Sequence, residues 1–240
     1  MNNSIVSVII PTVKGREHYL ERAIASVKNQ TYKNIELIVI NEGKPAPEQR
    51  NIGMEKAKGD YIAFLDDDDI WSPQKIGRQI EVMESEGVDF VVCSYYDERI
   101  NAIREPKARS SSDLLLSFSN FETSTILFKK ELYNKAGGMD IRFKSEQNHE
   151  LFYRFSKVGA FSIIEEPLMI KGYDGSSIGT NRMNKLQGYT LFHWKFKKDI
   201  LKMGIAKTLF MLSKFLITIL IFMLVGNPTK LYEKVKTWQR

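Results

Sequence analysis

Cysteine is nearly absent from this 240-residue chain, in which Cys93 is the only one. A single thiol excludes a disulfide framework and a cysteine-rich zinc site. Its place at the end of the apolar run Phe90–Cys93 predicts a buried structural thiol. The first residues also lack a positively charged segment followed by an apolar stretch, so we predict no secretory signal. These features favour a cytosolic protein, or one attached to the cytoplasmic face of the cell membrane.

Acidic residues are scarce in the last part of the chain. Residues 195–240 contain ten Lys or Arg and only two Asp or Glu, a net charge of +8, whereas residues 1–194 carry −2 of the total of +6. The basic excess therefore belongs to the tail and not to the body. A nucleic-acid-binding protein would combine a basic face with interleaved aromatics or a known motif. Because neither is present, we expect no nucleic-acid partner.

The most informative stretch joins an apolar run, Tyr61–Leu65, to four consecutive aspartates, Asp66–Asp69. The run predicts a buried parallel strand, and Ser72 followed by Pro73 predicts a helix start. The carboxylates then lie at the carboxyl end of a strand, where open α/β sheets bind ligands. Crowded carboxylates repel one another unless a cation is present, and oxygen ligands suit Mg²⁺ or Mn²⁺. The alternative is a solvated acidic loop.

Strand and helix patterns alternate along the first two-thirds of the chain, which predicts an α/β fold with a mostly parallel central sheet flanked by helices. We expect Arg99–Ser112 to be a surface loop. Residues 1–180 are expected to form the main domain and residues 181–240 a helical tail. The expected strands are Val6–Pro11, Glu36–Ile40, Tyr61–Leu65, Asp89–Ser94, Thr123–Lys129, Ser162–Glu165 and Met169–Tyr173. The expected helices are Glu17–Gln30, Glu48–Lys56, Pro73–Ser85, Lys130–Ala136 and Gln147–Val158.

The tail contains a long apolar run, Leu209–Val225, that only Lys214 interrupts. This length is marginal for crossing a bilayer, which needs about twenty apolar residues. Basic and aromatic residues precede the run, a pattern typical of an interfacial helix on anionic lipid. We therefore predict peripheral or monotopic attachment to an anionic membrane surface; the alternatives are a membrane span, packing on the main domain, or packing on a second subunit in an oligomer. The preceding residues are Lys195, Lys197, Lys198, Lys202 and Lys207, with Trp194 and Phe196 among them.

Polar residues also follow the first two predicted strands. Thr12 comes after the first strand and Asn41 after the second, so both would lie at the same sheet edge as Asp66–Asp69. A hydroxyl, an amide and a carboxylate cluster together indicate a nucleotide site in which a metal bridges the diphosphate to the protein. Each residue alone is a weak signal, because turn residues are expected at strand ends.

Six segments of the chain, in this order, resemble motifs of the family 2 glycosyltransferases. The resemblance covers about residues 4–175 and implies the GT-A nucleotide-sugar fold. It also implies transfer of a sugar, with inversion, from a nucleotide diphosphate, expected to be a UDP-sugar, to a surface-glycan or lipid-linked acceptor. The segments are Val6–Thr12, Ala23–Tyr32, Glu36–Ile40, Arg50–Gly53, Ala57–Asp69 and Gly137–Asp140.

The resemblance implies roles for residues at the nucleoside end of the donor. Pro11 and Thr12 would line the nucleoside pocket, and Arg50 would approach the nucleotide. Asn41 stands where the family usually has an aspartate that contacts the base; an amide can still pair with uracil. Between the second strand and Arg50 the family usually has a longer segment, so this wall of the pocket is trimmed.

At the diphosphate end, the resemblance implies that Asp66 and Asp67 hold the ribose and diphosphate region. Asp68, the last residue of the DxD motif, would bind the metal. The Mg²⁺ or Mn²⁺ ion would stabilise the departing diphosphate as a Lewis acid.

The general base is the weak point of the resemblance. An inverting transferase must deprotonate the acceptor hydroxyl, and the family's Glu-Asp pair falls on Gln147 and Asn148, whose amides cannot accept that proton. Neighbouring Glu146 is the candidate base, although it could equally cap the following helix. His149 and Glu150 are less direct candidates, and we expect His149 to lie on the helix surface or in the acceptor site.

We therefore expect a metal-assisted, membrane-associated glycosyltransferase. The alternative is a catalytically impaired relative that binds nucleotide-sugar and acts as a partner subunit. A nucleotidyltransferase would need a glycine-rich basic phosphate loop, of which Val13–Arg16 is a poor version. A phosphatase of the haloacid-dehalogenase type is excluded, because Pro11 and Thr12 stand where its aspartate would be.

Overall fold

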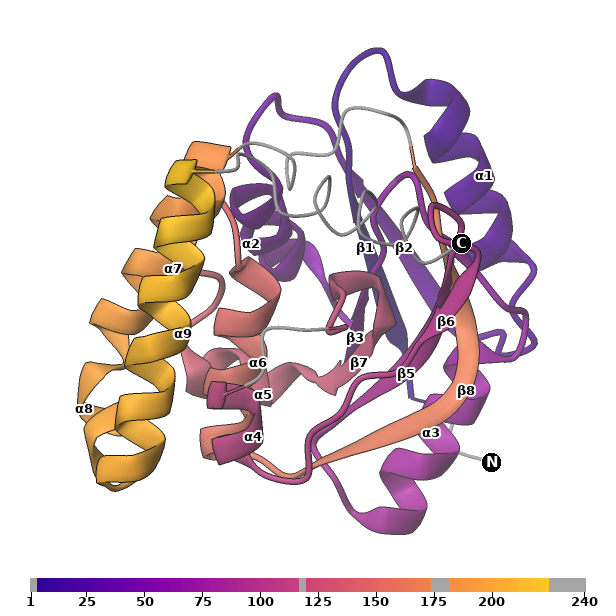
Figure 1. Ribbon diagram of the computed structural model, residues 1–240. Helices are drawn as coiled ribbons and strands as arrows, with labels where there is room; N and C mark the ends of the chain where they lie inside the picture. Colours follow the sequence, from indigo (N-terminus) through magenta and orange to yellow (C-terminus); the bar gives the residue numbers. More distant parts are fainter. Residues whose placement is uncertain (1–3, 117–119, 174–181, 225–240) are drawn as a thin grey trace. The chain divides into compact units, whose positions relative to one another are not determined.

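The computed structural model describes residues 4–116, 120–173 and 182–224 (Figure 1). The chain divides into two compact units. The first comprises Met1–Ile141 and Asn148–Asp174 and contains the β-sheet, and the second comprises Arg142–Gln147 and Gly175–Arg240.

The described part of the first unit has an eight-stranded sheet in the order β2-β1-β3-β7-β5-β8-β4, with β6 paired to β5. Neighbours are parallel in β1–β2, β1–β3 and β5–β8, and antiparallel in β3–β7, β5–β7, β4–β8 and β5–β6. The α/β class is confirmed, but the prediction of a mostly parallel sheet is wrong, because the sheet is mixed. The strands are β1 (Val6–Pro11), β2 (Ile35–Ile40), β3 (Tyr61–Phe64), β4 (Ile70–Trp71), β5 (Phe90–Asp97), β6 (Ala102–Arg104), β7 (Ile126–Lys129) and β8 (Phe161–Lys171).

The direction of β7 explains the mixed sheet and shapes the site. β7 lies between β3 and β5 and runs opposite to both. Its first residues therefore lie at the edge where the parallel strands β1, β2, β3, β5 and β8 end. A short 3-10 turn, η1 (Thr123–Thr125), precedes β7 at that edge.

Helices cover both faces of the sheet (Figure 1). On one face, Val8 and Ile10 of β1 belong to a buried cluster with Ala23 of α1 (Glu17–Lys28) and Ile80 of α3 (Lys75–Glu86). On the other face, Ile9 of β1 packs against α2 (Ala46–Lys56). The contact is so close that a Cβ at Gly53 of α2 would lie 2.4 Å from Cγ2 of Ile9. This alternation along β1 is that of a strand buried on both sides.

Aromatic rings hold two further helices to the second face. The ring of Phe128 in β7 lies 5.9 Å from that of Tyr133 in α5 (Lys130–Ala136) and 5.1 Å from that of Phe155 in α6 (Gln147–Val158). Aromatic pairs at such distances add to the energy of burial. The bounds predicted for these two helices are confirmed, and Cys93 is buried as predicted.

Several predicted boundaries are wrong. Helix α3 begins at Lys75 and has Gln74 as its N-cap residue, because Ile70–Trp71 pairs with β8 and the Ser72 N–H continues this ladder by bonding the Leu168 carbonyl at 2.9 Å. The two short strands expected after α6 form one long strand, β8, whose irregularity is absorbed by register shifts against β5. The expected surface loop 99–112 contains β6 and the start of α4 (Ser111–Leu116).

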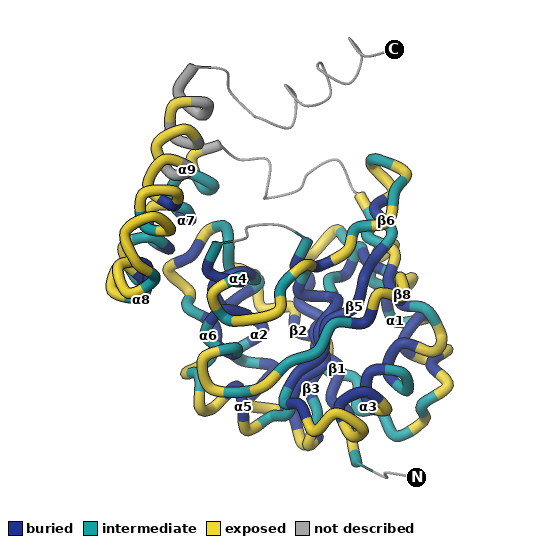
Figure 2. Tube along the Cα trace, turned by 60° about the horizontal axis from the view of Figure 1, so that its bottom comes forward, coloured by how far each residue is buried: buried dark blue, intermediate teal, exposed yellow. Residues whose placement is uncertain are grey.

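The described part of the second unit is helical, with α7 (Arg182–Lys195), α8 (Lys197–Lys202) and α9 (Ile205–Leu224). Phe192, Phe196 and Met211 are buried, whereas much of α9 is exposed (Figure 2). Within the described ranges, none of the helices has both the length and the apolar character required to cross a membrane. Val225, the last residue of the predicted apolar run, lies outside the described residues.

Candidate active site

The four aspartates form the connection between a central strand and an edge strand. β3 ends at Phe64, the Leu65 N–H bonds the Ile9 carbonyl of β1 at 3.1 Å, and β4 begins directly after Asp69. Since β4 pairs with the far end of β8, residues 66–69 (the aspartate turn) lie at the edge where β3, β5 and β8 end and where β7 begins. The predicted position of the carboxylates at a strand end is therefore confirmed.

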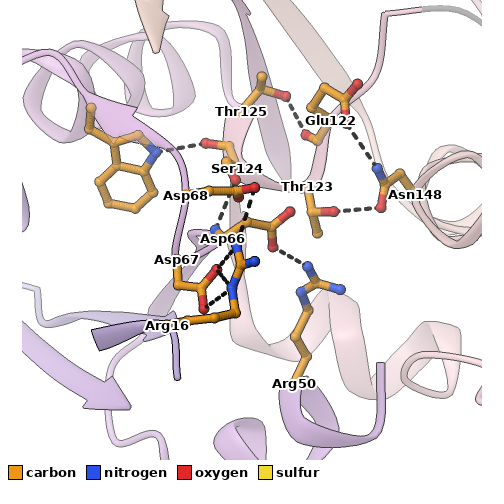
Figure 3. Close-up of polar contacts among 11 residues, drawn as sticks. Arg16, Arg50, Asp66, Asp67, Asp68, Glu122, Thr123, Ser124, Thr125 and Asn148 are labelled. Carbon is orange, nitrogen blue, oxygen red and sulfur yellow. Dashed lines mark hydrogen bonds and ion pairs between the residues drawn. The ribbon is translucent and has the colours of Figure 1, made fainter. Parts of the chain in front are cut away.

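Asp67 is buried and fully engaged by groups from the end of β1 and the start of α1. The Thr12 hydroxyl donates to its Oδ2 at 2.6 Å. The Arg16 guanidinium contacts both of its oxygens, with Nε at 2.9 Å and Nη2 at 2.8 Å. Nη2 of Arg16 also lies 3.3 Å from Oδ2 of Asp68. Arg16 therefore acts as a built-in cation between two carboxylates (Figure 3).

Asp66 is bound by a different set of groups from Asp67. Arg50 of α2, whose side chain is only 3% exposed, forms an ion pair with Asp66, and its buried Nε has no hydrogen-bond partner within the described part of the chain. The backbone N–H of Asp66 donates to the Ser124 hydroxyl at 2.9 Å. The Ser124 carbonyl in turn accepts from the Trp71 indole at 2.8 Å. The turn is thus tied to α2, to η1 and to β4.

Asp68 and Asp69 have perturbed acidities. Burial, and then the Asp66 carboxylate, raise the pKa of Asp68 to about 6, against the opposing effect of Arg16. Burial and the charges of Asp66 and Asp68 raise the pKa of Asp69 well above its usual range. The Gly172 N–H donates to Asp69 at 3.1 Å. Both pKa values are raised mainly by burial and further by the neighbouring carboxylates.

The site offers a metal ion one suitable carboxylate ligand and not a complete set of protein ligands. Within the described ranges, no group of three or more His, Cys, Asp or Glu side chains is arranged to hold a metal. The side chain of Asp68 is 24% exposed, whereas Asp67 is saturated by Arg16 and Thr12. Mg²⁺ is commonly held by one or two carboxylates together with substrate phosphates. The donor set at Asp68 fits that mode of binding.

Sequence reasoning missed the groups at the start of β7. Glu122 forms an ion pair with Lys171 at the end of β8, and Asn148 at the start of α6 contacts Glu122 and the Thr123 hydroxyl. Glu122, Thr123 and Asn148 lie beside the aspartate turn (Figure 3). The only sequence signal for Glu122 was the polar run Glu122–Thr125 before an apolar segment, and it becomes informative only when the direction of β7 is known; Asn148, by contrast, is identified by the resemblance as the residue at the family's base position.

The structure brings most of the predicted site residues together. Thr12, Asp66, Asp67, Asp68 and Arg50 are linked through the contacts above. Pro11 ends β1 directly before Thr12 and is paired with Ile40 of β2. Asn41 follows β2 but is exposed, and no side-chain hydrogen bond joins it to another described residue.

The acidic residues near Asn148 have different environments. Glu146 belongs to the second unit, has a left-handed backbone (φ 62°) and, together with burial, raises the pKa of Tyr189 in α7. His149 is buried and contacts the Leu114 carbonyl, so its predicted exposure is wrong; the reason is that α6 turns this position toward α4. Glu150 is buried and its carboxylate is paired with Arg154 at 2.5 Å.

Comparisons with known proteins agree with this architecture. The family model described as glycosyl transferase family 2 matches residues 7–49 and 46–148. A relative in Rickettsia typhi, named only as an uncharacterised glycosyltransferase, is 26% identical over 95% of this chain and 83% of its own length. The Escherichia coli protein WfgD, a UDP-Glc:α-D-GlcNAc-diphosphoundecaprenol β-1,3-glucosyltransferase, is 25% identical over 91% of this chain and 95% of its own.

Solved structures share the fold at low sequence identity. S. aureus TarS 1–349, crystallised in complex with UDP-GlcNAc, aligns over 92% of this chain and 73% of its own with a TM-score of 0.67 and 14% identity.

Proposed function

This chain belongs to glycosyl transferase family 2, and from that premise we propose that it transfers a sugar from a UDP-sugar to a lipid-linked saccharide. The uridine nucleotide is supported by WfgD, which uses UDP-Glc, and by the UDP-GlcNAc complex of TarS. The acceptor class is supported by WfgD, whose acceptor is a GlcNAc-diphosphate lipid. We further propose that the transfer inverts the anomeric carbon.

The observation that carries this proposal is the aspartate turn and its cations. Asp66, Asp67 and Asp68 meet Arg16 and Arg50 at the edge where β1 and β3 end. Carboxylates there can hold ribose hydroxyls, which are hydrogen-bond donors, and guanidinium groups are suited to phosphate oxygens. A solvated acidic loop, by contrast, would not be buried and tied down by Thr12 and Ser124.

We propose that Mg²⁺ or Mn²⁺ assists the transfer and that Asp68 holds it. When bound, the ion would neutralise charge on the departing diphosphate as a Lewis acid. The chain's own contribution is orientation: Asp67 and Arg16 fix the direction of the Asp68 carboxylate, and Arg50 fixes that of Asp66. We also propose that the protein works at the cytoplasmic face of the cell membrane, held by its basic and apolar tail.

Thermal unfolding with a panel of nucleotide sugars tests the donor and the metal together, since a ligand raises the melting temperature only by binding the folded state. We expect one UDP-sugar to stabilise the wild type in the presence of Mn²⁺ and to lose most of this effect without it. Asp68→Asn should abolish the Mn²⁺-dependent part.

The matched control for this experiment is Asp60→Asn. Asp60 is exposed and lies directly before Tyr61, at the opposite end of β3 from the aspartate turn, so the variant should respond to donor and metal like the wild type. Equal stabilisation of wild type and Asp68→Asn by donor with Mn²⁺ would contradict the metal assignment.

A further inference from the structure

Transfer to a hydroxyl group needs a base, and most carboxylates at the sheet edge are already committed. Asp67 is saturated by Arg16 and Thr12, and Asp66 is paired with Arg50. Asp69 is buried with its pKa raised well above the usual range, chiefly by burial itself. Asp68 is the proposed metal ligand. This inference rests on the proposed glycosyl transfer and concerns the group that receives the acceptor's proton.

Glu122 has two oxygens with unequal partners, and it contacts Asn148, which stands where the resemblance places the family's base. Oε1 forms the ion pair with Lys171 and accepts from the Tyr95 hydroxyl at 3.4 Å. Among the described residues, Oε2 has only a long contact, 3.4 Å from Nδ2 of Asn148. The side chain is 24% exposed. Oε1 is therefore anchored, whereas Oε2 is held only by the long contact with Asn148.

The position of Glu122 places this oxygen at the catalytic edge. Glu122 directly precedes η1, whose Ser124 hydroxyl accepts from the Asp66 N–H. Lys171 forms the ion pair with Glu122; burial lowers the pKa of its ammonium, but the charges of Glu122 and Asp69 raise this pKa above its usual value. Figure 3 shows Glu122, Thr123 and Asn148 near one another, next to Asp66 of the aspartate turn.

Asn148 completes the arrangement as a positioning residue. Its Oδ1 accepts from the Thr123 hydroxyl, which directs the Nδ2 donor toward Glu122. An amide held in this way has no proton-accepting capacity of its own, but it can orient a neighbouring carboxylate. The carboxylate that an acceptor site requires is thus supplied by the β7 side of the edge and not by α6.

We propose that Glu122 is the general base of the transfer. Its Oε2 takes the proton from the acceptor hydroxyl while the acceptor oxygen forms a bond to the anomeric carbon. The bond between that carbon and the diphosphate oxygen breaks, and its electron pair leaves with the nucleoside diphosphate. The neutral Glu122 acid then returns its proton to solvent. Lys171 and Asn148 hold the carboxylate in place throughout.

Substitution of Glu122 by glutamine tests the assignment, with UDP-glucose and a short-chain GlcNAc-diphosphate lipid as probes. General base catalysis contributes about 10²–10⁴-fold, so we expect Glu122→Gln to lower kcat at least about 100-fold with unchanged thermal stabilisation by donor and Mn²⁺. Glu165→Gln, at an exposed position of β8, is the matched control. Wild-type turnover in Glu122→Gln, with loss of turnover in Glu146→Gln instead, would overturn the proposal.

A nucleophile that needs no deprotonation can distinguish whether Glu122 acts as a base or only supports the structure of the site. Azide attacks the anomeric carbon as an anion, so its reaction with the donor should survive in Glu122→Ala. We expect the ratio of azide to hydroxyl transfer to rise at least about 100-fold relative to wild type. An equal fall with both nucleophiles would show that Glu122 only supports the fold of the site and would overturn the assignment.

Exchange of the two side chains gives a further measurement. The double variant Glu122→Gln/Asn148→Asp exchanges the carboxylate and the amide of this hydrogen-bonded pair. The amide introduced at position 122 can then donate to the carboxylate introduced at position 148. We expect the activity of this double variant to be at least about tenfold higher than that of Glu122→Gln, and no recovery would count against the pair.

Failure of the proposed function and failure of the base assignment give different results. If the wild type itself transfers no sugar from any donor, the proposed function fails. If the wild type is active and Glu122→Gln is equally active, only the base assignment fails.

Discussion

At the scale of single residues, four adjacent aspartates acquire four different environments. Asp67 is neutralised by a bidentate arginine, Asp66 is paired with a buried one, Asp68 is part-exposed and Asp69 is buried against Gly172. The sequence alone predicts the crowding of charge. It does not predict that Arg16 and Arg50 provide the compensating charge, because both arginines come from helices whose approach depends on the packing of α1 and α2.

Lys75, the first residue of α3, is a buried cation that sequence reasoning did not identify. Its Nζ donates to Gln79 at 2.6 Å and lies 4.1 Å from the centre of the Trp71 ring. Gln79 in turn donates to the Val91 and Thr125 carbonyls. Burial lowers the pKa of Lys75 to about 8, against a small opposing effect of Cys93. This network connects α3 to β5 and to the end of η1.

The lowered pKa of Lys75 predicts a pH-dependent stability. Between about pH 8 and 10.5 the unfolded chain holds a proton that the native Lys75 has released, so this residue's contribution to stability rises with pH. The shift corresponds to about 3 kcal/mol. We expect the free energy of unfolding of Lys75→Met, relative to wild type, to fall by about that amount between pH 7.5 and 10.5, as measured by urea unfolding. A difference independent of pH would contradict a charged, buried Lys75 at neutral pH.

At the scale of elements, local signals predicted helices well and strand direction poorly. α5 and α6 have the predicted bounds because Gly137 and Gly159 follow their last turns and stop them. The direction of β7 depends instead on how the chain returns to the sheet after β5, which no local pattern encodes. Glu122 was therefore missed, since it reaches the site only because β7 begins at the carboxyl edge of its neighbours.

The end of β8 supports the aspartate turn through a close approach at Gly172. A Cβ at this glycine would lie 1.9 Å from the Asp68 carbonyl oxygen, which is backbone and cannot move aside cheaply. We expect Gly172→Ala to destabilise the protein by about 1–3 kcal/mol and to weaken donor binding several-fold, because either β8 or the aspartate turn must shift. Chemical denaturation and calorimetry would measure the two effects.

Gly77 provides the matched control for Gly172. It lies inside α3, where a Cβ would meet only the Thr31 hydroxyl at an ordinary 3.7 Å. Gly77→Ala should therefore stabilise the protein by about 0.5–1 kcal/mol and leave donor binding unchanged. If Gly172→Ala behaved like Gly77→Ala, the aspartate turn would not depend on the backbone of β8.

At the scale of the whole molecule, charge and apolar surface are both concentrated in the tail. Residues 195–240 carry a net charge of +8, against −2 for the rest of the chain. Within α9, the side chains of Ile205, Leu209, Leu212, Leu216 and Leu220 are 46% to 81% exposed. In α7, Trp194 is exposed as well, and the Lys197 ammonium of α8 lies 3.6 Å from the centre of its ring. Exposed apolar helices beside cations are typical of a surface that meets anionic lipid.

Binding to vesicles tests this property on the full chain. We expect the wild type to sediment with vesicles that contain about one-third phosphatidylglycerol and much less with neutral phosphatidylcholine vesicles, because lysines near an anionic surface contribute about 1 kcal/mol each. Charge attraction is screened by salt whereas apolar insertion is not, so about 0.5 M NaCl should weaken binding without abolishing it.

Leu209→Glu/Leu216→Glu should remove most of the vesicle binding, because both side chains are exposed and would have to enter the acyl boundary as charged groups. The control is Thr190→Glu, at an exposed polar position of α7. Like each of the two leucine substitutions it adds one negative charge, so it should lower vesicle binding only by the effect of that charge. Donor-induced thermal stabilisation should be the same in all these variants, because the aspartate turn is held by contacts within the first unit. Full vesicle binding by the double variant would instead show that the apolar residues of α9 serve contact with protein.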